Sequence, residues 1–557
     1  MKSSGPFPFL VLVVCLLWGQ VEARLWQPLL PPPMAAAMTD DTLGGNSTFQ
    51  QLIDHKNPGL GTFSQRYWWN TTYWAGPGSP VLLFTPGEVA AHYYTGYLTN
   101  RTLVGLYAQE IGGATILIEH RYWGESSPYS ILDTKNLTYL TLENSVADLV
   151  HFARTVRLPF DKSGRSNAPD APWIDIGASY SAALAAWIHK LSPGTFWAYH
   201  ASSGPVQAIY DYWTYFLPIE RGMPKNCSAD ISRITGYIDE LIDHGKHAEL
   251  QALKEDFGLG GLEYADDFAG AVGGVVSGWQ SVTPSSNYSN FFQMCDTLEG
   301  VRPTAINGTN STASAKGPWS NVTIPSAAGI GLKKALPNLA SYFRHEYLPN
   351  TCAEYEYQDW LDPMSIGCFE SHNVSNPIFS DWAVNNTVNR QWIWMLCNEP
   401  FAYWQTGAPK GQRSVISRYV STDYYQRQCD LAFPPQGNAT HGSAAGRTVD
   451  KLNALTEGWD LTNTTRLLWV NGEFDPWRSA SVSSEIRPGG PLQSTPEVPV
   501  LLIKGGIHCS DMSGKSGEVN ADIHEMQHTA IAQIKKWTGE FYVGKSGPHS
   551  RRASWAA

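Results

Sequence analysis

The sequence predicts an α/β fold, with a parallel sheet covered by helices and interrupted by a large, mostly helical insertion. Residues 78–206 and 465–541 alternate short apolar runs with helical patterns. Continuous apolar strands that alternate with helices are typical of a parallel sheet buried on both faces. Between these stretches the alternation stops. The length of 557 residues leaves room for a second lobe beside such a core.

The first 45 residues are expected to lie outside the core. Residues 1–23 carry Lys2, an apolar run and a small-residue end, which is typical of a secretory signal peptide and too short to span a membrane. Residues 24–45 are rich in Pro and Ala and predict either a pro-segment or a loose N-terminal arm. No later stretch has about 18 continuous apolar residues, so we expect no membrane partner.

Residues 46–215 are expected to form the first part of the core. Apolar runs at 79–85, 114–120 and 172–177 predict strands, and residues 142–156 and 181–191 have helical spacing. Residues 216–445 are expected to form the insertion, with helical patterns at 230–258 and a Gly/Ser/Asn-rich stretch at 303–325. Residues 446–545 complete the core with strands near 465–477 and 498–512 and a helix over 522–541. Residues 546–557 form a C-terminal tail.

Cysteines and glycosylation sequons both indicate export. Six of the seven cysteines beyond the signal peptide lie between 227 and 429, and we expect them to form disulfides that pin the insertion. They are Cys227, Cys295, Cys352, Cys368, Cys397 and Cys429. Sequential neighbours are the favoured pairs, although sequence does not determine connectivity, and Cys509 is expected to be unpaired. The 13 Asn-x-Ser/Thr sequons are at Asn46, Asn70, Asn100, Asn136, Asn226, Asn287, Asn307, Asn310, Asn321, Asn373, Asn385, Asn438 and Asn463.

Three polar residues follow three of the predicted strands: Ser179, Asp475 and His508. Such strand-end loops meet at one edge of a parallel sheet. The chain order Ser, Asp, His is that of α/β-hydrolases, in which His activates Ser and Asp orients His. We therefore predict an α/β-hydrolase core with this catalytic triad. Glu473 is an alternative to Asp475, and Asp511 also lies near His508. An ordinary turn Asp and a surface His are the structural alternatives.

Small residues surround Ser179, as a tight strand-to-helix turn requires: Gly177, Ala178, Ser181 and Ala182. The backbone N–H of Tyr180 is a predicted oxyanion-hole donor, because it follows the nucleophile directly. The second donor is expected from residues 84–89, where Gly87 or Glu88 is the candidate. The alternative is that Pro-Gly forms a plain turn there.

A zinc-protease pattern also occurs, from His524 to His528 (HEMQH) on the last predicted helix. The two His share a helix face, but the third ligand of the extended motif is absent and Glu540 lies close to the chain end. We therefore expect no metal and no cofactor. The net charge of −11, without a basic stretch, argues against a nucleic-acid partner.

Long motifs lie at residues 51–70, 117–129, 139–149 and 390–405, and around Asp475 and His508. They resemble the serine peptidases of the lysosomal Pro-Xaa carboxypeptidase type, and among them the secreted prolyl endoproteases of filamentous fungi. The usual turn around the nucleophile reads Gly-Gly-Ser-Tyr-x-Gly in these proteins. Ala178 and Ala182 replace two of its glycines here, and each adds only one methyl group.

The resemblance implies an inserted helical lid and hydrolysis on the carboxyl side of proline at acidic pH, with Ser179, Asp475 and His508 as the triad. It also suggests that residues 391–405 help to form the proline pocket. Candidates that offer an apolar wall are Trp394, Met395 and Trp477; the alternative is that they are core side chains. An exopeptidase must bind a terminal charge, for which Glu88, Glu119, Arg121 and Glu125 are candidates unless they form structural ion pairs. The resemblance to the fungal proteins favours an endopeptidase.

We therefore predict a secreted, glycosylated serine peptidase that cleaves proline-containing peptides or proteins after proline, and also after alanine, through an acyl-enzyme. A vacuolar or lysosomal compartment is the alternative location, and the oligomeric state stays open. Alternatives for function are a proline-specific carboxypeptidase or dipeptidyl peptidase, an esterase or lipase on the same fold, and a catalytically silent binding protein. The complete triad argues against the last of these.

Overall fold

The computed structural model describes residues 43–285, 288–301 and 324–545. The predicted signal peptide, residues 24–42 of the predicted arm and the predicted tail lie outside these ranges, as do Asn287, Asn307, Asn310 and Asn321. The other nine sequon asparagines are all at least partly exposed, as glycosylation requires. Within the described ranges, no helix combines the length and apolar character needed to cross a membrane.

An eight-stranded sheet forms the centre of the core, with the strand order β1-β2-β4-β3-β5-β6-β9-β10. The strands are β1 (Gly44–Leu52), β2 (Thr62–Asn70), β3 (Val81–Phe84), β4 (Ala114–Ile118), β5 (Trp173–Ala178), β6 (Ala198–Ser202), β9 (Leu467–Gly472) and β10 (Val500–Ile503). The strands from β4 to β10 are parallel, as predicted, whereas β1 and β2 are antiparallel. Buried and exposed residues alternate at the start of β2, which is typical of a strand with one face toward solvent.

Helices cover both faces of this sheet, which confirms the predicted layers. On one face, α1 (Leu103–Ile111) and α16 (Ala521–Lys545) contribute to one buried apolar cluster with the strands. On the other face, α3 (Leu142–Thr155) and α4 (Tyr180–Leu191) contribute to a second cluster. The remaining core helices are α2 (Thr134–Leu137), α14 (Val449–Thr456) and α15 (Gly514–Val519). Burial of these apolar surfaces is the main driving force that holds the layers together.

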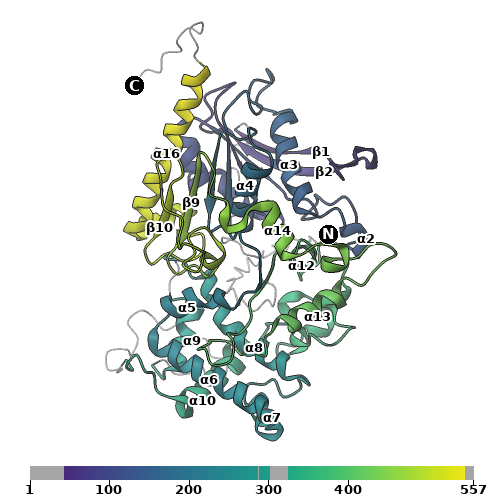
Figure 1. Ribbon diagram of the computed structural model, residues 1–557, viewed down its shortest axis with the longest axis vertical. Helices are drawn as coiled ribbons and strands as arrows, with labels where there is room; N and C mark the ends of the chain where they lie inside the picture. The colour runs from purple at the N-terminus through teal and green to yellow at the C-terminus, as the bar shows by residue number, and fades with distance from the viewer. Residues whose placement is uncertain (1–42, 286–287, 302–323, 546–557) are drawn as a thin grey trace, which may run out of the picture.

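A helical lid is built between β6 and β9, and it forms the lower part of the molecule in Figure 1. Its helices are α5 (Phe216–Gly222), α6 (Lys225–Asp243), α7 (His247–Asp256), α8 (Ala265–Ser277), α9 (Asn290–Leu298), α10 (Leu332–Tyr342), α11 (Pro377–Ser380), α12 (Arg390–Asn398) and α13 (Thr422–Ala432). Two short parallel strands, β7 (Ile209–Asp211) and β8 (Ala402–Trp404), pair beside the core. Three disulfides join sequential neighbours, as expected: Cys227–Cys295, Cys352–Cys368 and Cys397–Cys429. Cys509 is free and buried.

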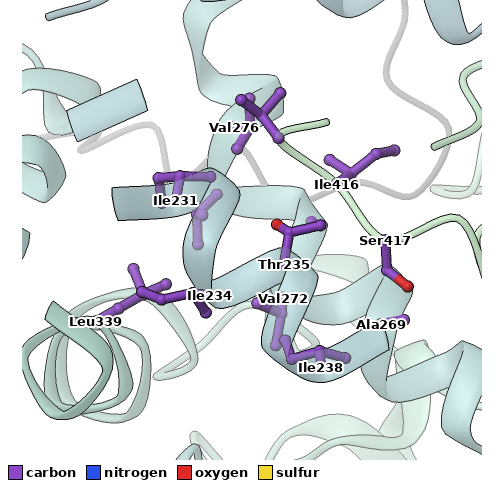
Figure 2. A pocket seen from close by; sticks show the side chains of 13 residues that line it. Ile231, Ile234, Thr235, Ile238, Ala269, Val272, Val276, Leu339, Ile416 and Ser417 are labelled. Carbon is purple, nitrogen blue, oxygen red and sulfur yellow. The ribbon is translucent and has the colours of Figure 1, made fainter. Parts of the chain in front are cut away.

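The lid has an apolar centre of its own. A small cavity lies between α6, α8 and α10 and residues 415–417, and Figure 2 shows the side chains that surround it. Ile231, Ile234 and Ile238 line it from α6 at helical spacing, and Val272 lines it from α8. All of the residues that line this cavity belong to the lid, so it is separate from the strand ends that carry the predicted triad.

Candidate active site

Ser179 lies on the sharp turn between β5 and α4. Its φ of 60° and ψ of −125° form a positive-φ conformation that a non-glycine residue adopts only under constraint. A Cβ atom on Gly177 would overlap the backbone of Ser181, so only glycine fits before the turn. The Ser181 hydroxyl bonds both to the N–H (2.9 Å) and to the carbonyl (2.8 Å) of Ala178. The surrounding backbone therefore holds Ser179 in its strained conformation.

The two alanines that replace glycines of the related motif fit within this turn. Ala178 and Ala182 are both buried. The methyl group of Ala182 faces Gly204, on which a Cβ atom would lie only 3.2 Å away. The glycine at 204 thus provides the space that the additional methyl group needs.

A chain of hydrogen bonds joins the three predicted catalytic residues. His508 Nε2 lies 2.9 Å from Ser179 Oγ, and His508 Nδ1 lies 2.9 Å from Asp475 Oδ1. The same Asp475 oxygen accepts the backbone N–H of Trp477 at 2.9 Å. A carboxylate can only accept, so the imidazole proton belongs on Nδ1 and the lone pair of Nε2 faces the serine. This arrangement can deprotonate Ser179 during attack.

Burial and charge act in opposite directions on the pKa of His508. Burial lowers the pKa, the charged forms of Cys509 and Asp475 raise it, and the net result is a pKa well above the usual value. Burial also raises the pKa of the Cys509 thiol, which keeps the thiol neutral, so we attribute the effect to the Asp475 carboxylate. Asp475 therefore stabilises the imidazolium that forms when His508 accepts a proton.

The structure separates Asp475 from the two other carboxylates near His508. The Glu473 carboxylate accepts the backbone N–H of Gly505 at 2.8 Å. The Asp511 carboxylate is bound by His200, at 2.9 Å, on the neighbouring strand β6. Both of these groups are thus engaged elsewhere, and Asp475 is the carboxylate that bonds to His508.

The two predicted oxyanion-hole residues lie next to each other. Gly87 has a φ of 78°, and a Cβ atom there would lie 3.2 Å from the ring of Tyr180. As the first residue of α4, Tyr180 has a backbone N–H with no acceptor within the helix. The N–H of Gly87 donates a long bond of 3.3 Å to Thr85 Oγ1, which an oxyanion would have to replace.

Two of the predicted substrate-binding residues lie where the lid meets the core. The carbonyl of Glu88, which is buried, accepts the side-chain amide of Asn389 at the start of α12 (3.1 Å). The indole of Trp477 donates to Gln280 of the lid (2.8 Å) and packs edge-on against Tyr403. Glu88 and Trp477 thus tie lid segments to the two loops that surround Ser179.

The other two, Trp394 and Met395, are buried within α12. Trp394 points to the core, where its indole donates to the carbonyl of Leu140 at 3.0 Å. Sequence reasoning missed Trp392, whose ring centroid lies 5.3 Å from that of Tyr180. Side chains two residues apart on a helix point about 200° away from each other, so helical periodicity could have shown that Trp392 and Trp394 lie on different faces of α12.

Three of the four candidates for binding a substrate terminus form hydrogen bonds or ion pairs with other residues of the protein. Arg121 donates two hydrogen bonds of 2.6 and 2.5 Å to Asp148, and both side chains are buried. Glu119 accepts the hydroxyl of Ser126 in its own loop at 2.7 Å, and the backbone N–H of Ala91, in the segment after β3, at 2.9 Å. Glu125 pairs with Arg66 at 2.8 Å. Their contacts are those of structural ion pairs and loop anchors, the alternative named for them above.

The three residues of the predicted triad are closed off from solvent. Ser179 and Asp475 have 0% of their surface exposed, and His508 has 6%. The buried rings of Tyr212 and Trp477 contact each other beside Asp475, and the hydroxyl of Tyr212 donates to the carbonyl of Pro476 at 3.2 Å. A substrate can reach Ser179 Oγ only if some of these side chains, or the lid itself, move.

Two groups of side chains bear on metal binding. His524 and His528 lie on the exposed face of α16, with ring centroids 4.4 Å apart. In the described part of the chain, a second group brings three potential ligand atoms within 4.8 Å of one another in the lid: Asp266, Asp267 and His372. Arg427 already donates to Asp266 at 2.9 Å. The guanidinium of Arg427, which is always positively charged, thus balances the negative charge of the Asp266 carboxylate that a metal ion would otherwise neutralise.

A sheet with a Ser–His–Asp relay at the ends of its parallel strands defines a serine hydrolase of the α/β-hydrolase class. The family model described as Serine carboxypeptidase S28 matches residues 50–298 and 342–529. The chain belongs to this family and is a serine-type peptidase, which confirms the resemblance.

Similar proteins include two from Bipolaris victoriae (strain FI3). Serine protease vicPa is 46% identical over 541 residues, which cover 96% of each chain. Serine protease vicPb is 43% identical over 537 residues, 96% of this chain and 97% of that one. The "Probable extracellular serine carboxypeptidase" of Arthroderma benhamiae is 30% identical over 85% of this chain and 64% of its own. A solved structure titled "Bacterial Heroin Esterase" aligns over 90% of this chain and 87% of its own, at 11% identity and a TM-score of 0.31.

Proposed function

We propose that this serine peptidase hydrolyses peptide bonds on the carboxyl side of proline, and also of alanine, as an endopeptidase. The observation that carries the proposal is the relay from Asp475 through His508 to Ser179, with two hydrogen bonds of 2.9 Å, beneath a lid lined with aromatic side chains.

In the proposed reaction, His508 Nε2 accepts the proton of Ser179 as Oγ attacks the scissile carbonyl carbon. The imidazolium is stabilised by Asp475, and the oxyanion by backbone N–H groups near Tyr180 and Gly87. His508 then gives its proton to the leaving amine, the C–N bond breaks, and an acyl-enzyme remains on Ser179. Water, activated by the same imidazole, releases the acyl product and restores the serine.

Selection of proline is proposed to rest on aromatic surfaces beside the nucleophile. Trp477 and Tyr403 pack edge-on at 5.2 Å between ring centroids, and Trp392 contacts Tyr180. A proline ring is apolar and rigid, so it loses little conformational freedom against such a wall.

Endopeptidase activity is favoured because a carboxypeptidase must hold the terminal carboxylate of its substrate. Arg121, one candidate for that role, is committed to Asp148. A carboxypeptidase is nevertheless the second candidate, since that word stands in the family description and in the name of the Arthroderma relative. Export is supported by three disulfides, by exposed sequon asparagines and by "extracellular" in the same name.

Digestion of a proline-rich protein and of short peptides blocked at either end tests the proposal, with products read by mass spectrometry. We expect cuts after proline within the chain and in doubly blocked peptides. A requirement for a free C-terminus would establish the carboxypeptidase instead. Cleavage without regard to proline would reject the proposed specificity, and turnover of simple esters alone would indicate an esterase.

A further inference from the structure

A second polar network lies beside the catalytic triad, on strand β6. His200 and Ser202 are fully buried and point to the same face of the sheet, because they are two residues apart. Both bind Asp511, which follows His508 by three residues. His200 Nε2 lies 2.9 Å from Asp511 Oδ2, and the Ser202 hydroxyl donates to Oδ1. On the other side of the imidazole, the hydroxyl of Tyr107 in α1 lies 2.9 Å from His200 Nδ1.

The hydrogen bonds of this network fix the position of the Asp511 side chain. An ionised Asp511 accepts only, so Ser202 and His200 Nε2 both donate to it, and His200 Nδ1 then accepts from Tyr107. The backbone carbonyl of Asp511 accepts the side-chain amide of Gln527 in α16, at 2.7 Å. Each of these side chains thus has its partners within the protein, and none of these bonds involves Ser179 Oγ or the imidazole of His508.

The end of β6 contacts the segments that carry all three catalytic residues. The carbonyl of Ser202 accepts the backbone N–H of Ser179 at 2.8 Å. The hydroxyl of Ser203 accepts the N–H of Cys509, next to His508, at 2.9 Å. The N–H of Ser203 donates to the carbonyl of Val470 at 2.7 Å, on the strand that leads to Asp475.

We propose that His200, Ser202 and Asp511 are positioning residues for His508. The carbonyl of Ser202 binds the backbone of Ser179, and its hydroxyl binds Asp511 in the loop that carries His508. This single residue therefore fixes the position of Ser179 relative to that of His508. Asp511 anchors the loop of residues 505–512 to this point, and His200 orients Asp511. The inference rests on the proposed triad. A displacement of about 1 Å in such a relay lowers the rate by about 100-fold.

The substitution Asp511→Asn tests this role, because it keeps the shape of the side chain but places a donor where the carboxylate accepts. We expect the rate of labelling by a fluorophosphonate, and kcat for a cleaved peptide, to fall by about 10- to 100-fold. KM should stay within about twofold, since no substrate contact is removed. His200→Gln, which retains a donor, should keep more activity than His200→Leu.

Asp239→Asn is the matched control. Asp239 is also buried and also binds a serine hydroxyl, that of Ser417, together with Arg418, but it lies in the lid. Its variant should label at the parental rate.

An Asp511→Asn protein that unfolds at the parental temperature and labels at the parental rate would overturn the inference. If this variant does not fold, Ser202→Ala decides by the same measurement, because it removes one hydroxyl and leaves the carboxylate in place. Labelling of Ser179→Ala at the parental rate would instead reject the triad, which is a separate outcome.

Discussion

The sheet core and the lid hold their parts of the active site by different means. In the core, Ser179, Asp475 and His508 follow β5, β9 and β10, strands whose ladder hydrogen bonds place them in one parallel sheet. In the lid, helices joined by three disulfides reach the site with side chains such as Trp392 and Gln280.

Because of this difference, the core sets the geometry of the catalytic relay, whereas the lid controls how a substrate reaches it. Backbone ladders leave little freedom to the strand ends, so the relay distances are set by the sheet. Side-chain contacts between lid and core can break individually, and the proposed role of the buried Ser179 requires that some of them do. We therefore expect changes in the core to lower the rate of bond cleavage and changes in the lid to alter substrate binding and stability.

The largest expected effect is that of Ser179→Ala in the core. Removal of the nucleophile should lower kcat by on the order of 10⁶-fold and abolish labelling by a fluorophosphonate. Mass spectrometry of the labelled parent should place the adduct on Ser179. Ser417→Ala is the control: this serine is also buried, but it lies in the lid and its hydroxyl bonds to Asp239, so labelling should continue. An adduct on another serine would break the assignment.

Asp475→Asn should have the next largest effect. The amide can no longer stabilise the Nδ1 proton of His508, and loss of the correct tautomer lowers kcat by about 10⁴-fold in a comparable triad. Steady-state kinetics on a proline-containing peptide measures this loss. Glu473→Gln provides the comparison, since that carboxylate contacts Gly505 and not His508. Equal losses in both variants would contradict the roles proposed here.

Stability is expected to fall as the pH rises, and the core should contribute more than the lid. Burial raises the pKa of Asp175 in β5 to about 8. The pKa of Glu399 in the lid is raised to about 7, chiefly by burial, although Arg447 opposes the shift. The unfolded chain releases these protons near pH 4 while the folded protein retains them, so folding is favoured at acidic pH and weakened between pH 4 and pH 8. If both shifts act in full, urea unfolding should show a loss on the order of 9 kcal/mol over this range.

Asp175→Asn should flatten this pH dependence of the unfolding free energy more than Glu399→Gln. If the unfolding free energies of the two variants depend equally on pH, the core and the lid do not differ in this respect.

Activity, in contrast to stability, is expected to fall at low pH. His508 must be neutral to accept the serine proton, and its raised pKa predicts that kcat/KM declines as the pH falls through that pKa. A profile that keeps rising toward pH 4 would contradict this effect of Asp475 on His508.

The smallest of these effects is expected from the lid disulfide Cys397–Cys429, which joins α12 to α13 across a sequence separation of 32 residues. Replacing both cysteines by alanine should cost about 3 kcal/mol of unfolding free energy. The looser α12 should raise KM for peptides several-fold, while a small fluorophosphonate should label at the parental rate. Thermal unfolding and kinetics check both effects. The pair Cys352–Cys368, with a separation of 16, serves as control and should leave KM unchanged.

Much of the core could be predicted because its signals are local. The apolar run at 79–85 contains β3, and the pattern over 522–541 lies within α16. The triad residues were identifiable because each follows such a run. The antiparallel hairpin of β1 and β2 was not predicted, because strand direction depends on which neighbours pair. The contact of Trp392 with Tyr180 also escaped prediction, since it joins positions far apart in the chain.

The sequence by itself determined the alternation of strands and helices, the residues at the strand ends and the cysteines available for disulfides, because these follow from side-chain type and short-range spacing. Only the tertiary structure decided that Asp475 bonds to His508 while Asp511 bonds to His200, and that Ser179 is closed off beneath the lid. The physical reason is that a hydrogen bond is made within about 3 Å. Such proximity between distant segments arises only when the sheet and the lid have packed together.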